Sequence, residues 1–328
     1  RAYQEMLGYA PEDLRRKTYV DLTPARWHEM EAGIVAEQIV ARGYSDVYEK
    51  EDVRADGAVF PVELRTFLLR DERGTPTGMW AIVRDVTERK LAEAQIHHIA
   101  HHDALTGLPN RHAFMQRAQE LIDGAGSAGE TLALLFVDLD HFKRVNDSLG
   151  HPVGDVLLQT VAERITGKLR GADLVARFGG DEFVLLLAGN PTPEAACEVA
   201  SKLLDAIGAP LRVEGVSISV TPSIGVAMFP SHGHTPAELV KHADTAMYHA
   251  KSLGRAGWGF FEPAMAEAAM AELALESRLA RAVREQEFEL HFQPQLALTD
   301  GALRGVEALL RWRHPEQGAI GPDGFLSI

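Results

Sequence analysis

Cysteine is almost absent from this sequence. The 328 residues contain one, Cys197, so no disulfide can form within the chain. A single thiol in a helix-like stretch is typical of a small buried residue in a reducing compartment, and we therefore expect the protein to be cytoplasmic. Because no cysteine precedes position 197, cysteinyl-flavin photochemistry is excluded for the N-terminal region.

Long apolar runs and an excess of basic residues are also missing. No apolar run approaches the roughly 18 residues that span a bilayer, and the N-terminus shows no signal peptide, so we expect no membrane segment in this chain. A net charge of -14 opposes binding to a nucleic acid polymer, whose phosphate backbone selects basic surfaces. Any phosphate ligand must therefore be held by local cations or by a metal ion.

What is present has the balance of a modular globular protein. Apolar residues make up 46% and charged residues 24%, which is enough apolar material for folded cores. The length favours two or more domains. Residues 1–86 alternate helix-like and strand-like pieces and end in a β-hairpin predicted over 58–69 and 79–86. Residues 87–102 predict a connector helix whose narrow apolar stripe favours pairing with a second chain only weakly, and a solvated linker is the alternative.

The central region, residues 103–263, alternates buried strands with amphipathic helices. Strands are predicted over 132–137, 174–178 and 182–187, with a hairpin over 211–220. One helix is indicated by the apolar spacing of residues 158–169, and a later one begins at Thr235 and stops at Gly254. A helical linker follows over 264–286, and residues 287–328 predict two further strands, 288–296 and 302–310.

Two acids follow the first central strand at the point where it ends. Side chains alternate along a strand, so Asp138 and Asp140 leave on one face. Carboxylates in such a position commonly hold Mg²⁺, which prefers oxygen ligands. We interpret Asp138 as a metal ligand and Asp140 as the cap of the following helix.

The hairpin at residues 177–183 places Gly179 and Gly180 directly before Asp181 and Glu182. The glycines permit positive φ and the close approach of a ligand. Two consecutive carboxylates at the mouth of an apolar hairpin lose solvation unless a cation lies beside them, so this turn also predicts a metal.

The string from Gly179 to Phe183 spells the motif of the GGDEF family of diguanylate cyclases. Residues 103–111, 138–147 and 250–255 are similar to three further motifs of that family, in the same order. The resemblance implies an enzyme that condenses two GTP molecules into cyclic di-GMP plus two pyrophosphates, with Mg²⁺ or Mn²⁺ as cofactor. It also implies a homodimer, because each domain offers one nucleotide site and the product has two-fold symmetry.

Carried over to this sequence, the resemblance assigns a role to each matching residue. The metal ligands are Asp138, Asp181 and the carbonyl of Leu139, and the catalytic residues are Asp181 and Lys143. The substrate-binding residues are Asn146, His151, Asp155, Gly179, Gly180, Lys251 and Arg255. Asn and Asp suit guanine, because the acid accepts from N1 and N2 and the amide donates to O6. Lys251 and Arg255, four residues apart at the end of a helix, point one way toward the triphosphate.

A further motif bears on regulation. Arg170 and Asp173 resemble the family's RxxD inhibitory site, at which cyclic di-GMP binds as product and inhibitor. An ordinary surface ion pair is the alternative. Ala256 departs from the family pattern, which often has Asn at that position.

The flanking regions resemble two other modules. Residues 1–86 look like a PAS sensor domain that lacks its first strand, with an unknown ligand; a haem held by His28 is one alternative. Residues 287–328 look like the start of an EAL domain, a cyclic di-GMP phosphodiesterase in which Glu307 would bind metal. The remaining acids of that active site are not in this sequence, so we expect no phosphodiesterase activity from this truncated segment.

These resemblances imply an α+β chain. A PAS domain (1–86) with an antiparallel sheet and a connector helix (87–102) precede a GGDEF domain (103–263), which has a central, mostly antiparallel sheet flanked by helices, as in cyclases and polymerase palms. A linker helix (264–286) and the first part of an EAL barrel (287–328) follow. The leading function is a diguanylate cyclase controlled by the PAS domain and by its product. The alternative is a GTP-binding module that activates a downstream phosphodiesterase.

Overall fold

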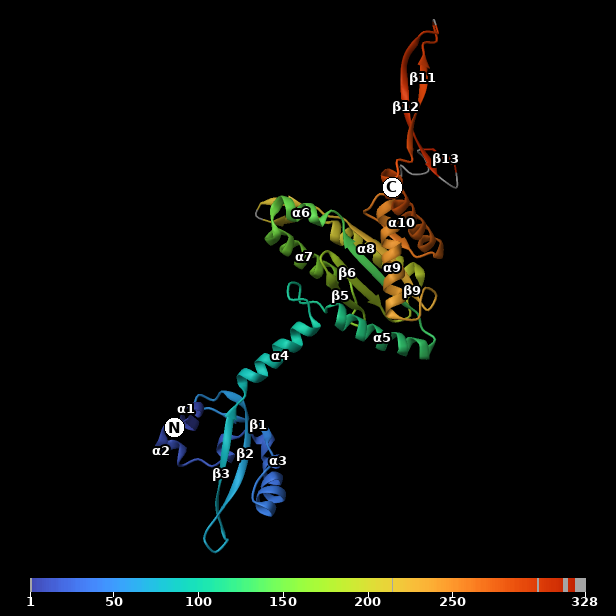
Figure 1. Ribbon diagram of the computed structural model, residues 1–328. Coiled ribbons are helices and arrows are strands. Elements are labelled where there is room, and N and C mark those ends of the chain that lie inside the picture. The colour runs from blue at the N-terminus through green and yellow to red at the C-terminus, as the bar shows by residue number, and fades with distance from the viewer. Residues whose placement is uncertain (1, 214, 300, 315–317, 322–328) are drawn as a thin grey trace. The chain divides into compact units, whose positions relative to one another are not determined.

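The chain divides into two compact units. The computed structural model describes residues 2–213, 215–299, 301–314 and 318–321 (Figure 1). One unit is Arg1–Ala100 and the other His101–Ile328. Each is described by itself.

The first unit is built on an antiparallel sheet of three strands in the order β1-β2-β3. The strands are β1 (Tyr48–Val53), β2 (Val59–Arg70) and β3 (Pro76–Asp85), and the helices are α1 (Ala2–Leu7), α2 (Pro11–Leu14), η1 (Val20–Leu22), η2 (Ala25–Trp27), α3 (His28–Ile34) and η3 (Val35–Val40). Alternate residues of β2, namely Phe60, Val62 and Leu64, pack with Leu7 and Leu22 in one core. The predicted hairpin is confirmed.

The hairpin turn is shorter than the sequence indicated. Asp71 closes it, because its carboxylate accepts the backbone N–H groups of Arg73 and Thr75. Strand β3 therefore begins at Pro76 rather than at residue 79.

The predicted connector helix is α4 (Thr87–His101). Its apolar residues lie in water: Leu91 is 62% exposed, and Ile96 and Ile99 are each 67% exposed. Within the described residues, the stripe is not covered by the rest of its own unit.

The second unit contains a five-stranded sheet in the order β10-β9-β4-β6-β5. The strands are β4 (Leu132–Leu139), β5 (Leu174–Gly179), β6 (Glu182–Leu187), β9 (Pro222–Phe229) and β10 (Trp258–Phe260). Every neighbouring pair is antiparallel except β10 with β9, which is parallel. The expected α+β architecture with a mostly antiparallel central sheet is confirmed.

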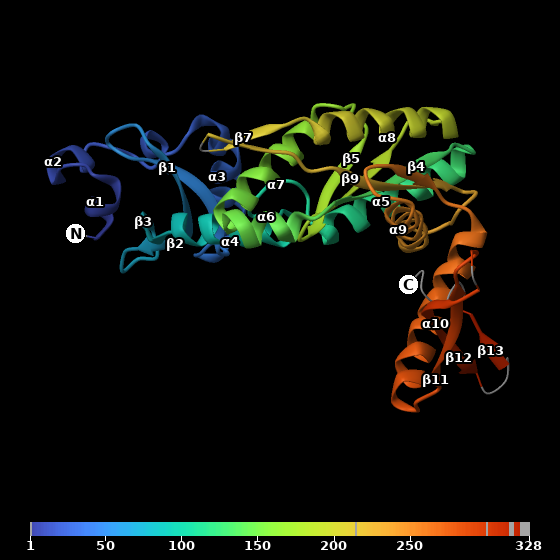
Figure 2. The same cartoon turned by 90° about the horizontal axis from the view of Figure 1, so that it is seen from above.

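Helices cover both faces of this sheet, as Figure 2 shows for α8 on one side and α5 and α9 on the other. The helices are α5 (Arg111–Ala128), α6 (Phe142–Leu149), α7 (His151–Thr166), α8 (Pro193–Gly208) and α9 (Pro236–Ser252). Strand β4 serves both cores, because Leu135 and Val137 pack with α7 and α8, whereas Leu134 and Phe136 pack with α5 and α9. Because β4 is buried on both faces, its sequence is continuously apolar, and this run predicted the strand.

Strand β9 was not identified from the sequence, although all of its residues are buried. It contains Pro222 and Gly225, both of which weaken a strand pattern. Gly225 is required by packing, because a Cβ there would lie 1.8 Å from the carbonyl oxygen of Ala243 in α9. The glycine lets α9 approach the centre of the sheet.

The remaining elements include the predicted hairpin, β7 (Leu211–Val213) and β8 (Val216–Ile218), whose Glu214 lies outside the described residues. The C-terminal segment contains α10 (Pro263–Arg284), β11 (Phe288–Leu296), β12 (Leu303–His314) and β13 (Gly318–Ile320). The two predicted strands are confirmed as β11 and β12, which pair antiparallel. No helix in the described part of the chain is long and apolar enough to cross a membrane.

Candidate active site

The site begins where β4 ends. The Asp138 side chain is only 13% exposed, and its Oδ1 lies 2.7 Å from Nζ of Lys251 in α9. Burial raises the pKa of Asp138, the hydrogen bond from Lys251 opposes this rise, and the charge of Asp181 adds to it. The Lys251 ammonium thus offsets part of the effect of burial on this carboxylate.

The β5–β6 hairpin brings Asp181 to the same place. Asp138 stands opposite Glu182 in the β4–β6 register, and the backbone N–H of Leu139 donates to the carbonyl of Asp181 at 3.3 Å. Gly179 and Gly180 have φ of 148° and 51°, and a Cβ on either would meet nothing within 4 Å. The turn thus needs glycine for its backbone and leaves open space above it.

Two more acids complete a carboxylate cluster, which we define as Asp138, Asp181, Glu182 and Asp244. Burial raises the pKa of Glu182, and the charges of Asp138, Asp244 and Asp181 raise it further. Burial likewise raises the pKa of Asp244, which Lys251 lowers. Asp244 was not predicted as a site residue, although it lies two helical turns before Lys251, a spacing that places both on one helix face.

The cluster suits a divalent cation by its charge. Among the described residues, no three acidic, histidine or cysteine side chains converge closely enough to form a metal cage, and the cation against Asp138 is Lys251. Mg²⁺ does not need such a cage, since it usually takes one or two carboxylates and completes its shell with water and phosphate. The negative charge of the cluster, which Lys251 offsets only in part, is therefore compatible with Mg²⁺.

Arg177 holds the hairpin turn by hydrogen bonds to its backbone and to Asp103. Its Nη1 lies 3.0 Å from Oδ1 of Asp103, while Nε and Nη2 donate to the carbonyl of Gly180 at 3.1 and 2.7 Å. Burial alone would raise the pKa of Asp103, but hydrogen bonds from Thr106 and Arg177 lower it below its usual value. Neither residue of this ion pair was predicted to have a role, because Asp103 and Arg177 are far apart in sequence.

The assignment of Asp140 as a helix cap is wrong. Its carboxylate is buried and accepts from the hydroxyls of Thr221 and Ser223, each at 2.8 Å, and from the backbone N–H of Ala256 at 3.0 Å. The N-cap of α6 is His141, whose side chain makes no capping bond. Asp140 instead ties β4 to β9 and to the loop after α9.

The proposed guanine residues lie around the junction of α6 and α7. Asn146 belongs to α6, and its Oδ1 is buried without a hydrogen-bond partner among the described residues. It lies against Gly154 of α7, where a Cβ would come within 1.9 Å of that oxygen. Asp155 is the next residue, and His151 is one turn earlier; both are exposed. The α6–α7 junction thus places Asn146, Asp155 and His151 close together.

The proposed phosphate residues are not equivalent in the structure. Lys143 is exposed on α6, and Lys251 is paired with Asp138. Lys251 and Arg255 do not share one helix face, contrary to the prediction, because α9 ends at Ser252. Arg255 lies in the following loop with φ of 64°.

The remaining motif residues lie outside the cluster. Arg170 is exposed, and the Asp173 carboxylate accepts from the backbone N–H groups of Arg170 and Ala188 at 2.8 and 3.1 Å. Asp173 therefore has a structural role in the turn before β5. Glu307 is exposed on β12, opposite Gln293 of β11.

Comparisons with known families match three parts of the chain. The family described as "Diguanylate cyclase, GGDEF domain" matches residues 100–257, "PAS fold" matches residues 1–91, and "EAL domain" matches residues 276–328.

Individual proteins agree with these matches. The bifunctional diguanylate cyclase/cyclic di-GMP phosphodiesterase MucR of Pseudomonas aeruginosa is 44% identical over 242 residues, 74% of this chain and 35% of MucR. The cyclic di-GMP phosphodiesterase NbdA of the same species is 43% identical over 237 residues, 72% of this chain and 30% of NbdA. The chain thus spans about a third of the length of these relatives.

Among solved structures, a GGDEF-domain structure of TpbB (YfiN), also from Pseudomonas aeruginosa, is 43% identical with a TM-score of 0.51. The match covers 52% of this chain and 99% of that one.

Proposed function

Because the chain belongs to the GGDEF family, with a PAS-fold region before that domain and an EAL segment after it, we propose that its central domain is an active diguanylate cyclase. One observation carries the proposal. The end of β4 and the Gly179–Gly180 turn bring Asp138 and Asp181 together in a half-buried carboxylate cluster that a single lysine opposes.

The proposed reaction forms two phosphodiester bonds. In each half, the 3′-hydroxyl of one GTP attacks the α-phosphorus of the other, the bond to the β-phosphate breaks, and pyrophosphate leaves. Asp181 is the proposed acceptor of the hydroxyl proton. Mg²⁺ or Mn²⁺, held by Asp138, Asp181 and the Leu139 carbonyl, would supply positive charge against the triphosphate.

The other residues bind and orient GTP. Asn146 and Asp155 read the guanine edge, with His151 beside them, and the common position of these residues at the α6–α7 junction supports this role. Lys143 and Arg255 contact phosphate. When substrate binds, the Lys251 ammonium leaves Asp138 and contacts the triphosphate instead. The open space above Gly179 and Gly180 receives the nucleotide.

The test is incubation of the chain with GTP and Mg²⁺, followed by chromatography of the nucleotides. We expect cyclic di-GMP and pyrophosphate, and a loss of about a hundredfold or more in Asp181→Asn. Asp205→Asn, at an exposed position of α8, is the matched control and should retain activity.

The second candidate is a regulatory GTP-binding module, favoured by the likeness to NbdA, which is named as a phosphodiesterase. Tight GTP binding without turnover in the native chain would support it and contradict the cyclase. Coupling of that kind is reciprocal, so GTP affinity would then depend on the state of the downstream domain.

We also propose that Arg170, with the turn that Asp173 holds, binds the product and limits activity. Arg170→Ala should raise the cyclic di-GMP level at which synthesis stops, because the exposed guanidinium is lost while the turn stays intact. Lys168→Ala, which removes an exposed cation two residues away, should not. Equal product inhibition in both variants would contradict the assignment.

A further inference from the structure

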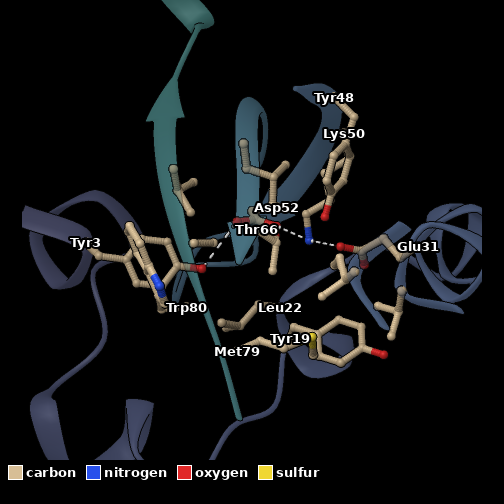
Figure 3. Close-up of a pocket in the computed structure, with 15 residues that line it drawn as sticks. Tyr3, Tyr19, Leu22, Glu31, Tyr48, Lys50, Asp52, Thr66, Met79 and Trp80 are labelled. Atoms are coloured by element: carbon tan, nitrogen blue, oxygen red, sulfur yellow. Dashed lines mark hydrogen bonds and ion pairs between the residues drawn. The ribbon is translucent and has the colours of Figure 1, made fainter. Parts of the chain in front are cut away.

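The N-terminal unit contains a cavity of about 290 Å³ (Figure 3). This volume is near the lower end for ligand pockets in proteins, which start at about 300 Å³, so it suits a small molecule. Aromatic and apolar side chains, including Tyr3, Leu22 and Trp80, line part of it. The haem alternative finds no support, because His28 is not among the lining residues and its ring bonds to the Thr23 carbonyl at 2.9 Å.

A buried ionic triad forms the polar part of the cavity. Lys50, Glu31 and Asp52 have side chains that are 4%, 5% and 2% exposed. Nζ of Lys50 lies 2.8 Å from Oε1 of Glu31 and 3.0 Å from Oδ1 of Asp52, and it also donates to Thr23. Three oxygens thus surround the ammonium, although Oδ1 of Asp52, like Oε2 of Glu31, is buried without a hydrogen bond among the described residues.

The triad has acceptors to spare. Oε2 of Glu31 is buried and has no hydrogen-bond partner among the described residues, although Glu31 lines the cavity. Oδ2 of Asp52 receives only a long bond of 3.4 Å from the Tyr3 hydroxyl. Two carboxylates share one ammonium, and a buried charge without full compensation is costly. Burial also raises the pKa of Asp52. A cationic donor would offset that rise and would supply the hydrogen bond that Oε2 of Glu31 lacks.

We propose that this cavity binds a small organic cation, an ammonium group on an aromatic or other apolar body. The ammonium donates to Oε2 of Glu31, and the body packs against the apolar wall that includes Leu22 and Trp80 (Figure 3). Aromatic faces also attract cations, which adds to the selectivity. An anion would be repelled by the two carboxylates, so it should bind weakly. A neutral molecule would not offset their negative charge, so it should bind less tightly than a cation.

Three probes of similar shape and different charge test the proposal: 2-phenylethylammonium, 2-phenylethanol and phenylacetate. Isothermal titration of the full chain, without GTP, should show the cation binding about tenfold or more tightly than the alcohol, because a hydrogen bond to a charged group is the stronger. Phenylacetate should bind most weakly. Equal affinities, tightest binding of phenylacetate, or no binding of any probe at millimolar concentration would overturn the proposal.

Variants locate the site. Glu31→Gln keeps the size of the side chain but removes its charge, so the preference for the cation over the alcohol should disappear. Glu29→Gln, an exposed acid of the same helix, should keep that preference. If Glu31→Gln fails to fold, Trp80→Ala replaces it, because Trp80 is 47% exposed and lies outside the triad. Trp80→Ala should lower the affinity for the cation and for the alcohol to the same extent. Unchanged affinities would show that the ligand does not bind in this cavity.

Discussion

Ala256 occupies a backbone conformation that alanine disfavours. Arg255 and Ala256 have φ of 64° and 50°, in the left-handed region that costs an ordinary L-residue about 1 kcal/mol. The conformation persists because the Ala256 N–H donates to the buried carboxylate of Asp140, which is also fixed by Thr221 and Ser223. The position where this sequence departs from its family is thus a strained contact with the core.

We expect Ala256→Asn to stabilise the chain by about 0.5–1 kcal/mol, because Asn tolerates left-handed φ and the N–H bond to Asp140 is kept. Denaturant unfolding of the second unit measures the change. Ala268→Asn, at an exposed position inside α10, should be destabilising, since Asn is a poorer helix former than Ala. Destabilisation in both variants would show that the loop does not favour Asn.

At the scale of elements, the closest approach in the proposed guanine site is that of α6 to α7. A Cβ on Gly154 would lie 1.9 Å from Oδ1 and 3.0 Å from Cγ of Asn146, and 3.2 Å from the ring of Phe142. Both neighbouring residues belong to α6. We therefore expect the added methyl of Gly154→Ala to displace the Asn146 side chain.

Gly154→Ala should therefore weaken GTP binding by about tenfold, since one displaced polar contact costs about 1.4 kcal/mol, and overpacking should lower stability by about 1–3 kcal/mol. Titration with a non-hydrolysable GTP analogue and thermal unfolding measure the two effects. In Gly124→Ala of α5 the added methyl meets nothing within 4 Å, so that variant should bind normally. Normal nucleotide affinity in Gly154→Ala would remove Asn146 from the site.

Elements defined by local sequence were predictable, and those defined by packing were not. Strands β4 and β6 are buried apolar runs, and α9 has its cap, Thr235, which accepts from the Glu238 N–H at 3.2 Å. Strand β9 was missed because Gly225, which weakens the pattern, is required by the distant helix α9.

The same division holds within the site. The hairpin motif pointed to Asp181, but the ion pair of Arg177 with Asp103 and the bonds of Asp140 to Thr221 and Ser223 join residues far apart in sequence. The local sequence around Asp140 is typical of a helix cap. In the folded chain its carboxylate instead accepts hydrogen bonds from two hydroxyls and a backbone N–H that lie far away in sequence.

At the scale of the whole molecule, the proposed reaction needs two chains, since one GGDEF domain supplies one nucleotide site. Helix α4 offers a surface for pairing, with Ile96 and Ile99 each 67% exposed on one apolar stripe. The net charge of -14 opposes the approach of a second copy. Association therefore depends on apolar contact that outweighs charge repulsion, and raising the salt concentration should strengthen it by screening.

Replacing Ile96 and Ile99 together by Glu should abolish pairing, because it removes the apolar stripe and adds like charge to both helices. We expect the variant to sediment as a monomer and to form cyclic di-GMP at a rate per chain that rises steeply with protein concentration. The control adds charge on the opposite side of α4, with Ala94→Glu at an exposed position, and should behave as the native chain does. If the stripe variant kept both native sedimentation and native activity on dilution, pairing through α4 would be ruled out. The two active sites would then have to meet through the surfaces of the GGDEF domains alone.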